Sequence, residues 1–372
     1  MVRESGWNTV KLKDICDFIG GGTPSKQVEN FWCGNIPWIS SSDLIESSIW
    51  EINITRHITA EAVAKSATHI CPRNTVLVVS RVGVGKVAIA PFEVCTSQDF
   101  TNLVSKKHDA RFLAYCIQNK MKIMAEKTQG TSIKGVTVEN IAQMEIELPP
   151  QEEQTAIAEA LSDIDNLISS QQKLIEKKKA IKQGTMQELL TGKKRLPGFY
   201  KEWRIVQIGE TLSIGHGQSQ KTVENRFGKY PILATGGCIG YANDFLWDKP
   251  SVLIGRKGTI DKPQYADYPF WTIDTLFYTK IFDGYDAKFI YYKFCMIDWQ
   301  QYNEASGVPS LNATTIENLQ IIVPEKDEQQ AIAQILSDMD SEIEQLEKKL
   351  AKYQQIKQGM MQELLTGRIR LV

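Results

Sequence analysis

The chain has 372 residues, 42% of them hydrophobic and 23% charged, with a formal net charge of −1. This length allows two or three globular domains, and the near-zero charge means that any surface binding nucleic acid must be local. No run of about 18 apolar residues exists, which argues against a membrane span. Seven cysteines without a CxxC pair, and a start that does not resemble a signal peptide, indicate a cytoplasmic protein with reduced thiols.

The first predicted domain, the first module, covers residues 1–148. Short β-rich runs such as Thr75 to Ser80 alternate with Gly and Ser clusters, which is typical of a mixed α/β domain. The segment SRVGVGK (80–86) superficially resembles a phosphate loop, but it lacks the first Gly and the Ser or Thr after Lys. Gly20 to Gly22 are followed by Pro24 and do not open a helix in dinucleotide-binding style, so we expect a turn there.

Residues 149–196 predict one long helix. Its apolar residues follow heptad spacing, as in a coiled-coil seam, and the seam weakens at Gln171 and Lys178. Pro149-Pro150 mark the start, and Gly192 is suited to a left-handed cap at the end. A helix of about 38 residues would be about 55 Å long at 1.5 Å per residue. The seam residues are Ile157, Leu161, Ile164, Ile168 and Ile175.

The second module covers residues 197–323 and shares short patterns with the first. Trp7-x-x-Val10-x-Leu12 matches Trp203-x-x-Val206-x-Ile208, and LVVSRVG (77–83) matches VLIGRKG (252–258). The second match pairs Arg81 with Arg256, and Asp99 would pair with Asp274. Outside these patterns the modules diverge, so we expect one scaffold that presents different surfaces at two sites.

Residues 324–372 repeat the first long helix at a constant offset of 175 residues (149 to 324), without a gap. Since the first helix leads into the second module and the second helix leaves it, the seams can pair if the second helix runs back. The sequence therefore predicts an α+β fold with two modules separated by an antiparallel coiled coil, related by a pseudo-two-fold repeat. Gly184 and Gly359 lie inside the helices, where a close approach of the other helix or of a partner, or early fraying of the helix, would explain them. The seam of the second helix consists of Ile332, Leu336, Met339, Ile343, Leu346, Leu350 and Tyr353.

Three features resemble the specificity subunit of bacterial type I restriction–modification systems. They are the doubled helix start P…EQ-x-x-I-A-x-x-L-S-D-x-D, the doubled ending IKQG-x-MQELLTG, and the linker RLPGFYKEW (195–203). The resemblance implies that each module is a target-recognition domain reading one half of a split site in double-stranded DNA. It also implies that the helices bind two modification (methyltransferase) subunits, that restriction subunits join the complex, and that the chain itself is not catalytic.

Polar loops of the modules supply the candidate DNA contacts, because phosphates and base edges are contacted by Lys, Arg, Ser, Thr, Asn, Gln and backbone amides. In the first module the candidates are Thr23, Ser25, Lys26, Ser40, Ser41, Ser42, Arg81, Lys86, Thr131 and Lys134. In the second module they are Gln218, Lys221, Thr235, Gly236, Arg256, Lys257, Ser306 and Ser310. Each could instead be an ordinary solvated loop residue. A recurring Arg could hold the shared scaffold or a phosphate, since residues that read bases should differ between modules.

Catalytic and metal sites are not expected. The Asp/Asn-Pro-Pro-aromatic motif usual in adenine methyltransferases is missing, since Pro149-Pro150 follow Leu148, and the four histidines show no metal-ligand spacing. No cofactor is therefore predicted. Two alternatives stay open: a coiled-coil adaptor without DNA binding, and a remnant of a fused methyltransferase–nuclease, which would need motifs that this chain lacks.

Overall fold

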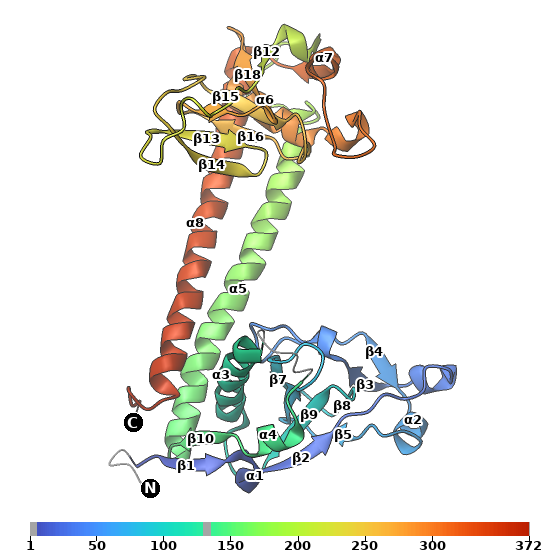
Figure 1. Ribbon diagram of the computed structural model, residues 1–372. Helices are drawn as coiled ribbons and strands as arrows, with labels where there is room; N and C mark the ends of the chain where they lie inside the picture. Colours follow the sequence, from blue (N-terminus) through green and yellow to red (C-terminus); the bar gives the residue numbers. More distant parts are fainter. Residues whose placement is uncertain (1–5, 129–134, 372) are drawn as a thin grey trace. The chain divides into compact units, whose positions relative to one another are not determined.

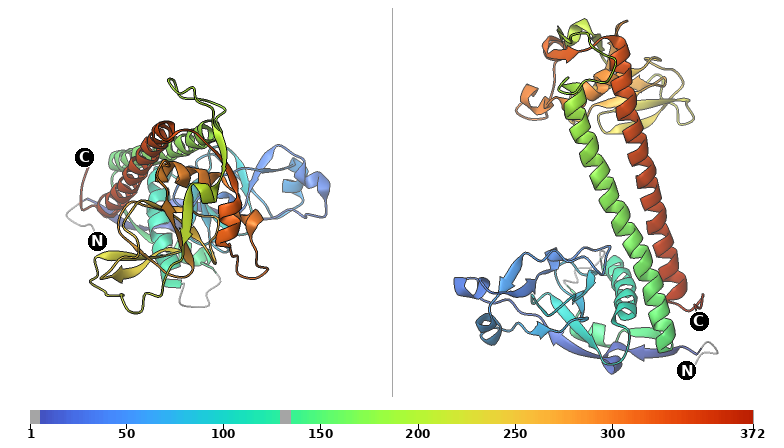
Figure 2. Two further views of the ribbon diagram at one scale, coloured as in Figure 1. Left: turned by 90° about the horizontal axis from the view of Figure 1, so that it is seen from above. Right: turned by 180° about the vertical axis from the view of Figure 1, so that it is seen from behind.

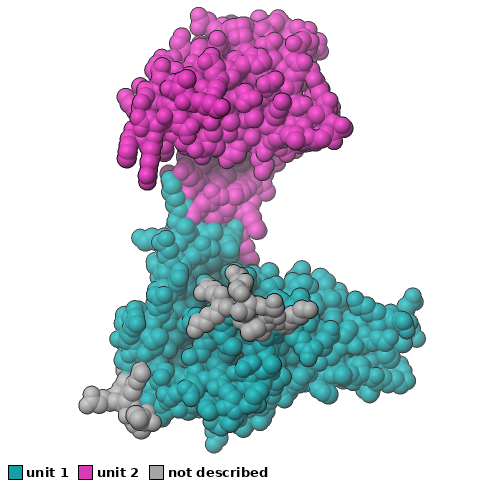
Figure 3. All heavy atoms as spheres, viewed as in Figure 1, with its two compact units in different colours: residues 1–172, 348–372 teal, residues 173–347 magenta. Residues whose placement is uncertain are grey.

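The computed structural model describes residues 6–128 and 135–371 and divides into two compact units (Figure 3). Unit 1 consists of residues 1–172 and 348–372, and unit 2 of residues 173–347. Each unit thus combines one module with segments of both long helices. Both units mix helices with strands, which confirms the predicted α+β class.

Unit 1 is built around two four-stranded sheets in the orders β2-β9-β6-β7 and β4-β3-β8-β5, with a separate β1-β10 pair. All pairings are antiparallel except β3–β8, which is parallel. The strands are β1 (Asn8–Lys11), β2 (Cys16–Gly20), β3 (Ile36–Ile39), β4 (Arg56–Ile58), β5 (Ile70–Cys71), β6 (Val76–Val79), β7 (Val87–Ile89), β8 (Val94–Thr96), β9 (Phe100–Ser105) and β10 (Glu145–Leu148). The helices are α1 (Leu12–Ile15), α2 (Ala60–Ala64), α3 (Ala110–Thr128) and α4 (Val138–Ala142), with 3-10 turns at Glu29–Trp32 and Ser41–Asp43.

Unit 2 repeats this plan with a four-stranded sheet β12-β18-β15-β16, a three-stranded sheet β14-β13-β17 and a β11-β19 pair. Here the parallel pair is β13–β17. The strands are β11 (Arg204–Gln207), β12 (Leu212–Gly215), β13 (Tyr230–Ala234), β14 (Gly237–Ala242), β15 (Ser251–Gly255), β16 (Gln264–Ala266), β17 (Trp271–Thr272), β18 (Leu276–Ile281) and β19 (Gln320–Val323). The helices are α6 (Ala287–Met296) and α7 (Ala313–Asn318), with 3-10 turns at Ile208–Glu210 and Trp299–Tyr302.

Two long helices, α5 (Gln151–Leu190) and α8 (Lys326–Leu364), contribute to both units, as the repeat predicts (Figure 1). Their starts are built alike: Gln154 donates to the Pro149 carbonyl at 2.8 Å, and Gln329 donates to the Pro324 carbonyl at 2.9 Å. Their ends are alike too, because Gly192 (φ +72°) and Gly367 (φ +69°) are left-handed. The predicted glycine caps are therefore confirmed.

Within each unit the α5 and α8 segments lie side by side and run in opposite directions (Figures 1 and 2). In unit 2, Lys178 pairs with Glu342 and Lys182 with Asp340, so that higher numbers on α5 face lower numbers on α8. Both helices continue past Gly184 and Gly359, which rules out early fraying. An added Cβ at either glycine would meet no atom within 4 Å. Neither glycine is therefore required for close packing of α5 against α8 within its unit.

The module cores take up the beginnings and ends of the long helices. Ile157 and Leu161 of α5 belong to the main core cluster of unit 1, together with Leu364 at the end of α8 and Leu365 directly after it. Unit 2 uses the opposite ends, since its main cluster contains Leu189 and Leu190 of α5 together with Ile332 and Leu336 of α8. Some residues of the predicted heptad seam therefore pack in the hydrophobic cores of the modules.

A Tyr–Asp–Lys contact joins module and helices once in each unit. In unit 1 the Tyr115 hydroxyl donates to Asp165 at 2.7 Å, and Lys357 pairs with the same carboxylate at 2.6 Å. In unit 2 the Tyr292 hydroxyl donates to Asp340 at 2.7 Å, and Lys182 pairs with that carboxylate. Burial and the neighbouring aspartate raise the pKa of both tyrosines, so their hydroxyls stay protonated as donors.

A Trp–Glu–Arg contact is likewise present in both units. Trp7 donates its indole N–H to Glu153 at 3.1 Å, and Arg370 from the end of the chain pairs with that glutamate. In unit 2, Trp203 donates to Glu328 at 3.1 Å, and Arg195 pairs with Glu328 at 2.8 Å. The residues that follow α8 thus pair with the start of α5 in unit 1, and the residues that follow α5 pair with the start of α8 in unit 2.

Candidate nucleic-acid interface

In unit 1 one candidate residue, Arg81, lines a cavity where β2, β6 and the segment before α4 meet. The cavity has a volume of about 540 Å³. Its described lining residues are Gly20, Gly21, Ser80, Arg81, Gln98, Phe100, Thr101, Gly135, Val136, Thr137 and Val138. Arg81 is exposed, and the Thr23 hydroxyl donates to Gln98 at the rim. Among the candidates, Arg81 thus lines the cavity, and Thr23 contacts a lining residue.

The serine turn of unit 1 is tied to the loop that follows β6. Lys86 donates to the Ser41 carbonyl at 3.1 Å, and an added Cβ on Gly83 would lie 3.9 Å from Ser41. Ser40 is held by a capping box with the buried Asp43, which also pairs with Arg56. Ser40 and Lys86 thus have defined structural partners, which favours a scaffold role for both.

The other candidates of unit 1 are not placed at the cavity. Ser25 and Lys26 are exposed in a separate turn, where Trp32 donates its indole N–H to the Ser25 carbonyl at 3.2 Å. Ser42 is exposed beside Ser40, with their hydroxyl oxygens 2.9 Å apart. Thr131 and Lys134 lie outside the described residues.

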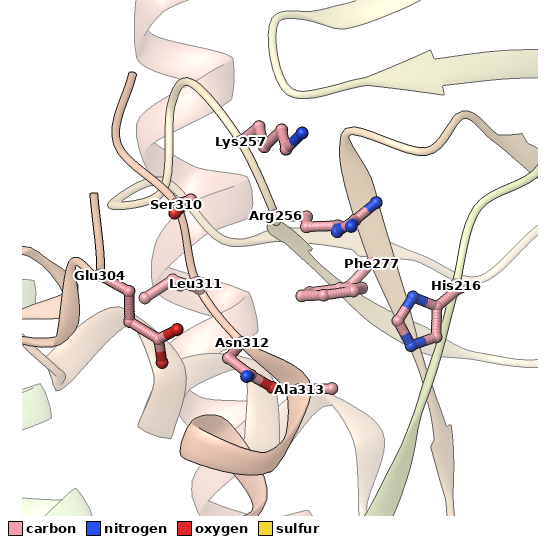
Figure 4. Close-up of a pocket in the computed structure, with 9 residues that line it drawn as sticks. All are labelled: His216, Arg256, Lys257, Phe277, Glu304, Ser310, Leu311, Asn312 and Ala313. Carbon is pink, nitrogen blue, oxygen red and sulfur yellow. The ribbon is translucent and has the colours of Figure 1, made fainter. Parts of the chain in front are cut away.

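Unit 2 has a cavity of about 260 Å³ in the corresponding place (Figure 4). It brings together Arg256, Lys257 and Ser310 among the candidates, and Lys257 forms a β-bridge with Ser310. Thr235 lies nearby, since an added Cβ on Gly258 would be 3.6 Å from its hydroxyl oxygen. The lining residues are His216, Arg256, Lys257, Phe277, Glu304, Ser310, Leu311, Asn312 and Ala313.

Four other candidates of unit 2 do not line the cavity. Gln218 follows His216 in the chain, and its backbone N–H donates to the Thr272 carbonyl at 2.8 Å. Lys221, Gly236 and Ser306 are exposed.

Backbone register corrects one expectation, because Arg81 and Arg256 do not occupy equivalent positions. The N–H of Ser80 donates to the Asp99 carbonyl, and the carbonyl of Ser80 accepts from Val136 at 2.7 Å. In unit 2 it is Arg256 that makes this pair of bonds, with Thr275 and Leu311. Arg256 therefore stands where Ser80 does, and Asp99 corresponds to Thr275 instead of Asp274. The sequence match aligned Gly83 with Gly258, whereas the hydrogen bonds align the preceding strands one residue differently.

His216 is a cavity residue that the sequence reasoning missed, because the histidines were tested only for metal-ligand spacing. Gly22 donates to the Thr96 carbonyl as Gln218 donates to the Thr272 carbonyl, both at 2.8 Å. Gly22 and Gln218 are therefore equivalent, and two residues earlier His216 occupies in unit 2 the position that Gly20 occupies in unit 1. Trp7 and Trp203 precede these two positions by the same distance, and that spacing could have identified the pair.

Within residues 6–128 and 135–371, no group of three or more His, Cys, Asp or Glu side chains is arranged to hold a metal ion. No helix in this part of the chain is long and apolar enough to cross a membrane. The seven cysteines are free thiols, and burial raises the pKa of Cys16, Cys71 and Cys116 to about 12. These three thiols therefore stay protonated.

Comparisons with known proteins agree on one family. The family model described as the type I restriction modification DNA specificity domain matches residues 4–180 and again residues 200–358. The type I restriction enzyme MjaIX specificity subunit of Methanocaldococcus jannaschii is 24% identical over 406 residues, covering 98% of this chain and 94% of the relative.

Solved structures show the same fold. A crystal structure of the S subunit of a type I restriction–modification system from M. genitalium aligns with a TM-score of 0.68 at 16% identity, covering 96% of both chains. A chain from a structure on complex assembly and conformational transition of the type I system aligns with a TM-score of 0.57 at 15% identity, covering 98% of both chains. At these identities, the likeness concerns the fold alone.

Proposed function

Because the chain belongs to the family of type I restriction–modification DNA specificity domains, we propose that it is the specificity subunit of such a complex. Each unit reads one half of a split target in double-stranded DNA. The observation that carries this proposal is one scaffold built twice with different residues at its cavity. Unit 1 has Gly20 and Ser80 where unit 2 has His216 and Arg256. Such differences suit two sites that read different base pairs.

The long helices act as the spacer and as the docking site for other subunits. We propose that α5 and α8 form an antiparallel coiled coil that relates the two units by a pseudo-two-fold repeat. Support comes from the Tyr–Asp–Lys and Trp–Glu–Arg contacts, which recur with the helix partners exchanged. On this proposal two modification subunits bind at repeat-equivalent positions, restriction subunits join them, and the chain contributes recognition instead of catalysis. A coiled-coil adaptor without DNA binding is not favoured, because it gives no reason for the divergent cavities.

Methylation mapping tests the proposal directly. Single-molecule sequencing of host DNA, with and without this gene, should show one split motif that disappears when the gene is deleted. A motif that persists without the gene would contradict the proposal. The purified chain alone should not bind S-adenosylmethionine in calorimetry, and micromolar binding of this cofactor would contradict a purely recognising subunit.

A chimaera separates recognition from the spacer. Leu12 donates to the Met144 carbonyl as Ile208 donates to the Leu319 carbonyl, so residues 13–143 can be exchanged for residues 209–318 at matched backbone positions. A chain with two copies of the second module should methylate an inverted repeat of one half-site. The matched control carries the native modules, and an unchanged motif in the chimaera would show that the modules do not read the target.

A further inference from the structure

The cavity of unit 2 concentrates basic side chains on one side. Arg256, Lys257 and His216 line it, and Figure 4 shows Arg256 and His216 beside Phe277. Glu304 is the acidic residue among the described lining residues, and it lies on the other side of the view. Its carboxylate accepts a hydrogen bond from the Thr315 hydroxyl at 2.6 Å. The side of the cavity that holds Arg256 therefore offers donors and positive charge.

The backbone holds these basic residues in fixed positions. The Arg256 N–H donates to the Thr275 carbonyl at 2.8 Å, and the Arg256 carbonyl accepts from Leu311 at 2.9 Å. Among the residues that the structure describes, its guanidinium donates to the Asp274 carbonyl at 3.3 Å, and an Arg carries five N–H donors. The His216 ring packs edge-on against Phe277, with ring centroids 5.0 Å apart. Arg256 thus keeps donors available for a ligand and is oriented before the ligand arrives.

We propose that this cavity binds one phosphodiester of the DNA backbone and so fixes the register of the second half-site. The inference rests on the proposed function and adds to it the chemical group that the cavity takes. A guanidinium fork matches the oxygens of a phosphate, the Lys257 ammonium adds a point charge, and the His216 imidazole adds a donor. Contacts of this kind position a protein on the duplex, while base contacts supply the specificity.

A salt titration of the full-length chain on a duplex carrying its mapped target tests the charge. Arg256→Met and Lys257→Met should each lower the steepness of log K against log salt by a fraction of one, and Arg256→Met/Lys257→Met should lower it by about one, because the two residues share a single phosphate. Lys249→Met is the matched control, because Lys249 is exposed and precedes β15, whereas Arg256 follows that strand. The control should leave the slope unchanged.

A neutral phosphate identifies the ligand itself. Methylphosphonate placed at one backbone position at a time should weaken binding of the wild-type chain about tenfold or more at a single phosphate of the second half-site, because a charge-assisted hydrogen bond is lost. The same duplex should lose less than twofold with Arg256→Met/Lys257→Met. Gly20→His transfers the third basic residue to unit 1, where an added Cβ meets no atom within 4 Å, and it should tighten binding about two- to tenfold.

The outcomes separate this site from the function on which it rests. Normal preference for the target, with unchanged slopes in both cavity variants or with no phosphate that depends on Arg256, would overturn the cavity assignment and leave the specificity function intact. An effect of Arg256→Met confined to duplexes carrying one base pair would also overturn it, because it would mean that Arg256 reads a guanine. A wild-type chain that binds no duplex would overturn both.

Discussion

The two Tyr–Asp–Lys contacts differ in burial, and this difference predicts unequal stabilisation of the two units. In unit 1 the side chains of Asp165 and Lys357 are 7% and 11% exposed. In unit 2 those of Asp340 and Lys182 are 42% and 20% exposed. Lys357 also donates to the Ser47 carbonyl at 3.0 Å, so it joins α8 both to α5 and to the first module.

Removing one partner of a buried ion pair leaves an uncompensated charge and costs about 3–5 kcal/mol, whereas exposed pairs contribute about 0.2–1 kcal/mol. We therefore expect Asp165→Asn or Lys357→Met to destabilise unit 1 by about 3 kcal/mol. In the double variant the coupling energy between the two positions should be about 2 kcal/mol. The same cycle with Asp340→Asn and Lys182→Met should give less than about 1 kcal/mol in unit 2. Asn keeps an oxygen for the tyrosine hydroxyl, so each cycle isolates the lysine.

Native-state hydrogen exchange in urea measures both units in one sample, because α3 reports on unit 1 and α6 on unit 2. The unit 2 variants serve as the matched control for those of unit 1. Equal coupling in the two units, or stronger coupling in unit 2, would refute the link between burial and stabilisation.

Two further predictions concern the helices and their ends. Lys293 is buried, donates to the Leu190 carbonyl at 3.0 Å, and burial lowers its pKa to about 8. Between about pH 8 and 10.5 the unfolded state binds more protons than the folded state. The free energy of unfolding, measured in urea relative to Lys293→Met, should therefore rise by about 3 kcal/mol across that window and stay constant below it. A difference in this free energy that does not change with pH would contradict the lowered pKa. Gly184→Ala and Gly359→Ala should each raise the free energy of unfolding by about 0.5–1 kcal/mol, since both lie in continuous helices with open space around the added Cβ. If the modification subunit packs closely against these glycines, pull-down of that subunit should weaken in the same variants, and unchanged pull-down would mean that it does not.

The helices could be derived from the sequence because their signals are local. Heptad spacing, prolines before the start and glycines at the end fall within one repeated stretch, and α5 and α8 follow them closely. Which module each helix end enters is not a local property. Leu189 and Leu364 look alike in the repeat, yet the first packs in unit 2 and the second in unit 1.

The cavities were predictable only in part, because strand pairing decides their geometry. The recurrence of an Arg beside a Gly drew attention to Arg81 and Arg256, and both line a cavity. The one-residue shift that makes Ser80, and not Arg81, the equivalent of Arg256 follows from hydrogen bonds to residues distant in the chain, such as Asp99 and Thr275, which a pattern match does not contain. His216 could have been found from its spacing to Trp203, but its proximity to Phe277 and Arg256 follows from the sheet and not from the sequence.

The residues after α8 give the last prediction, because they belong to unit 1 although they end the chain. Arg370 pairs with the buried Glu153, which also accepts the Trp7 indole N–H, and an added Cβ on Gly367 would lie 3.3 Å from the Trp7 ring. Arg370→Ala leaves Glu153 without this cation, so hydrogen exchange should accelerate in β1 and β10 and not in β11 and β19.

Arg195→Ala is the matched variant, because Arg195 pairs with Glu328 beside Trp203 in unit 2. It should accelerate exchange in β11 and β19 and leave β1 and β10 protected. If Arg370→Ala loosened unit 2, or if neither variant changed exchange, the contacts would not be what closes each unit. The two variants are expected to act on different units because the glutamate at the start of each long helix forms its ion pair with the arginine that follows the other long helix.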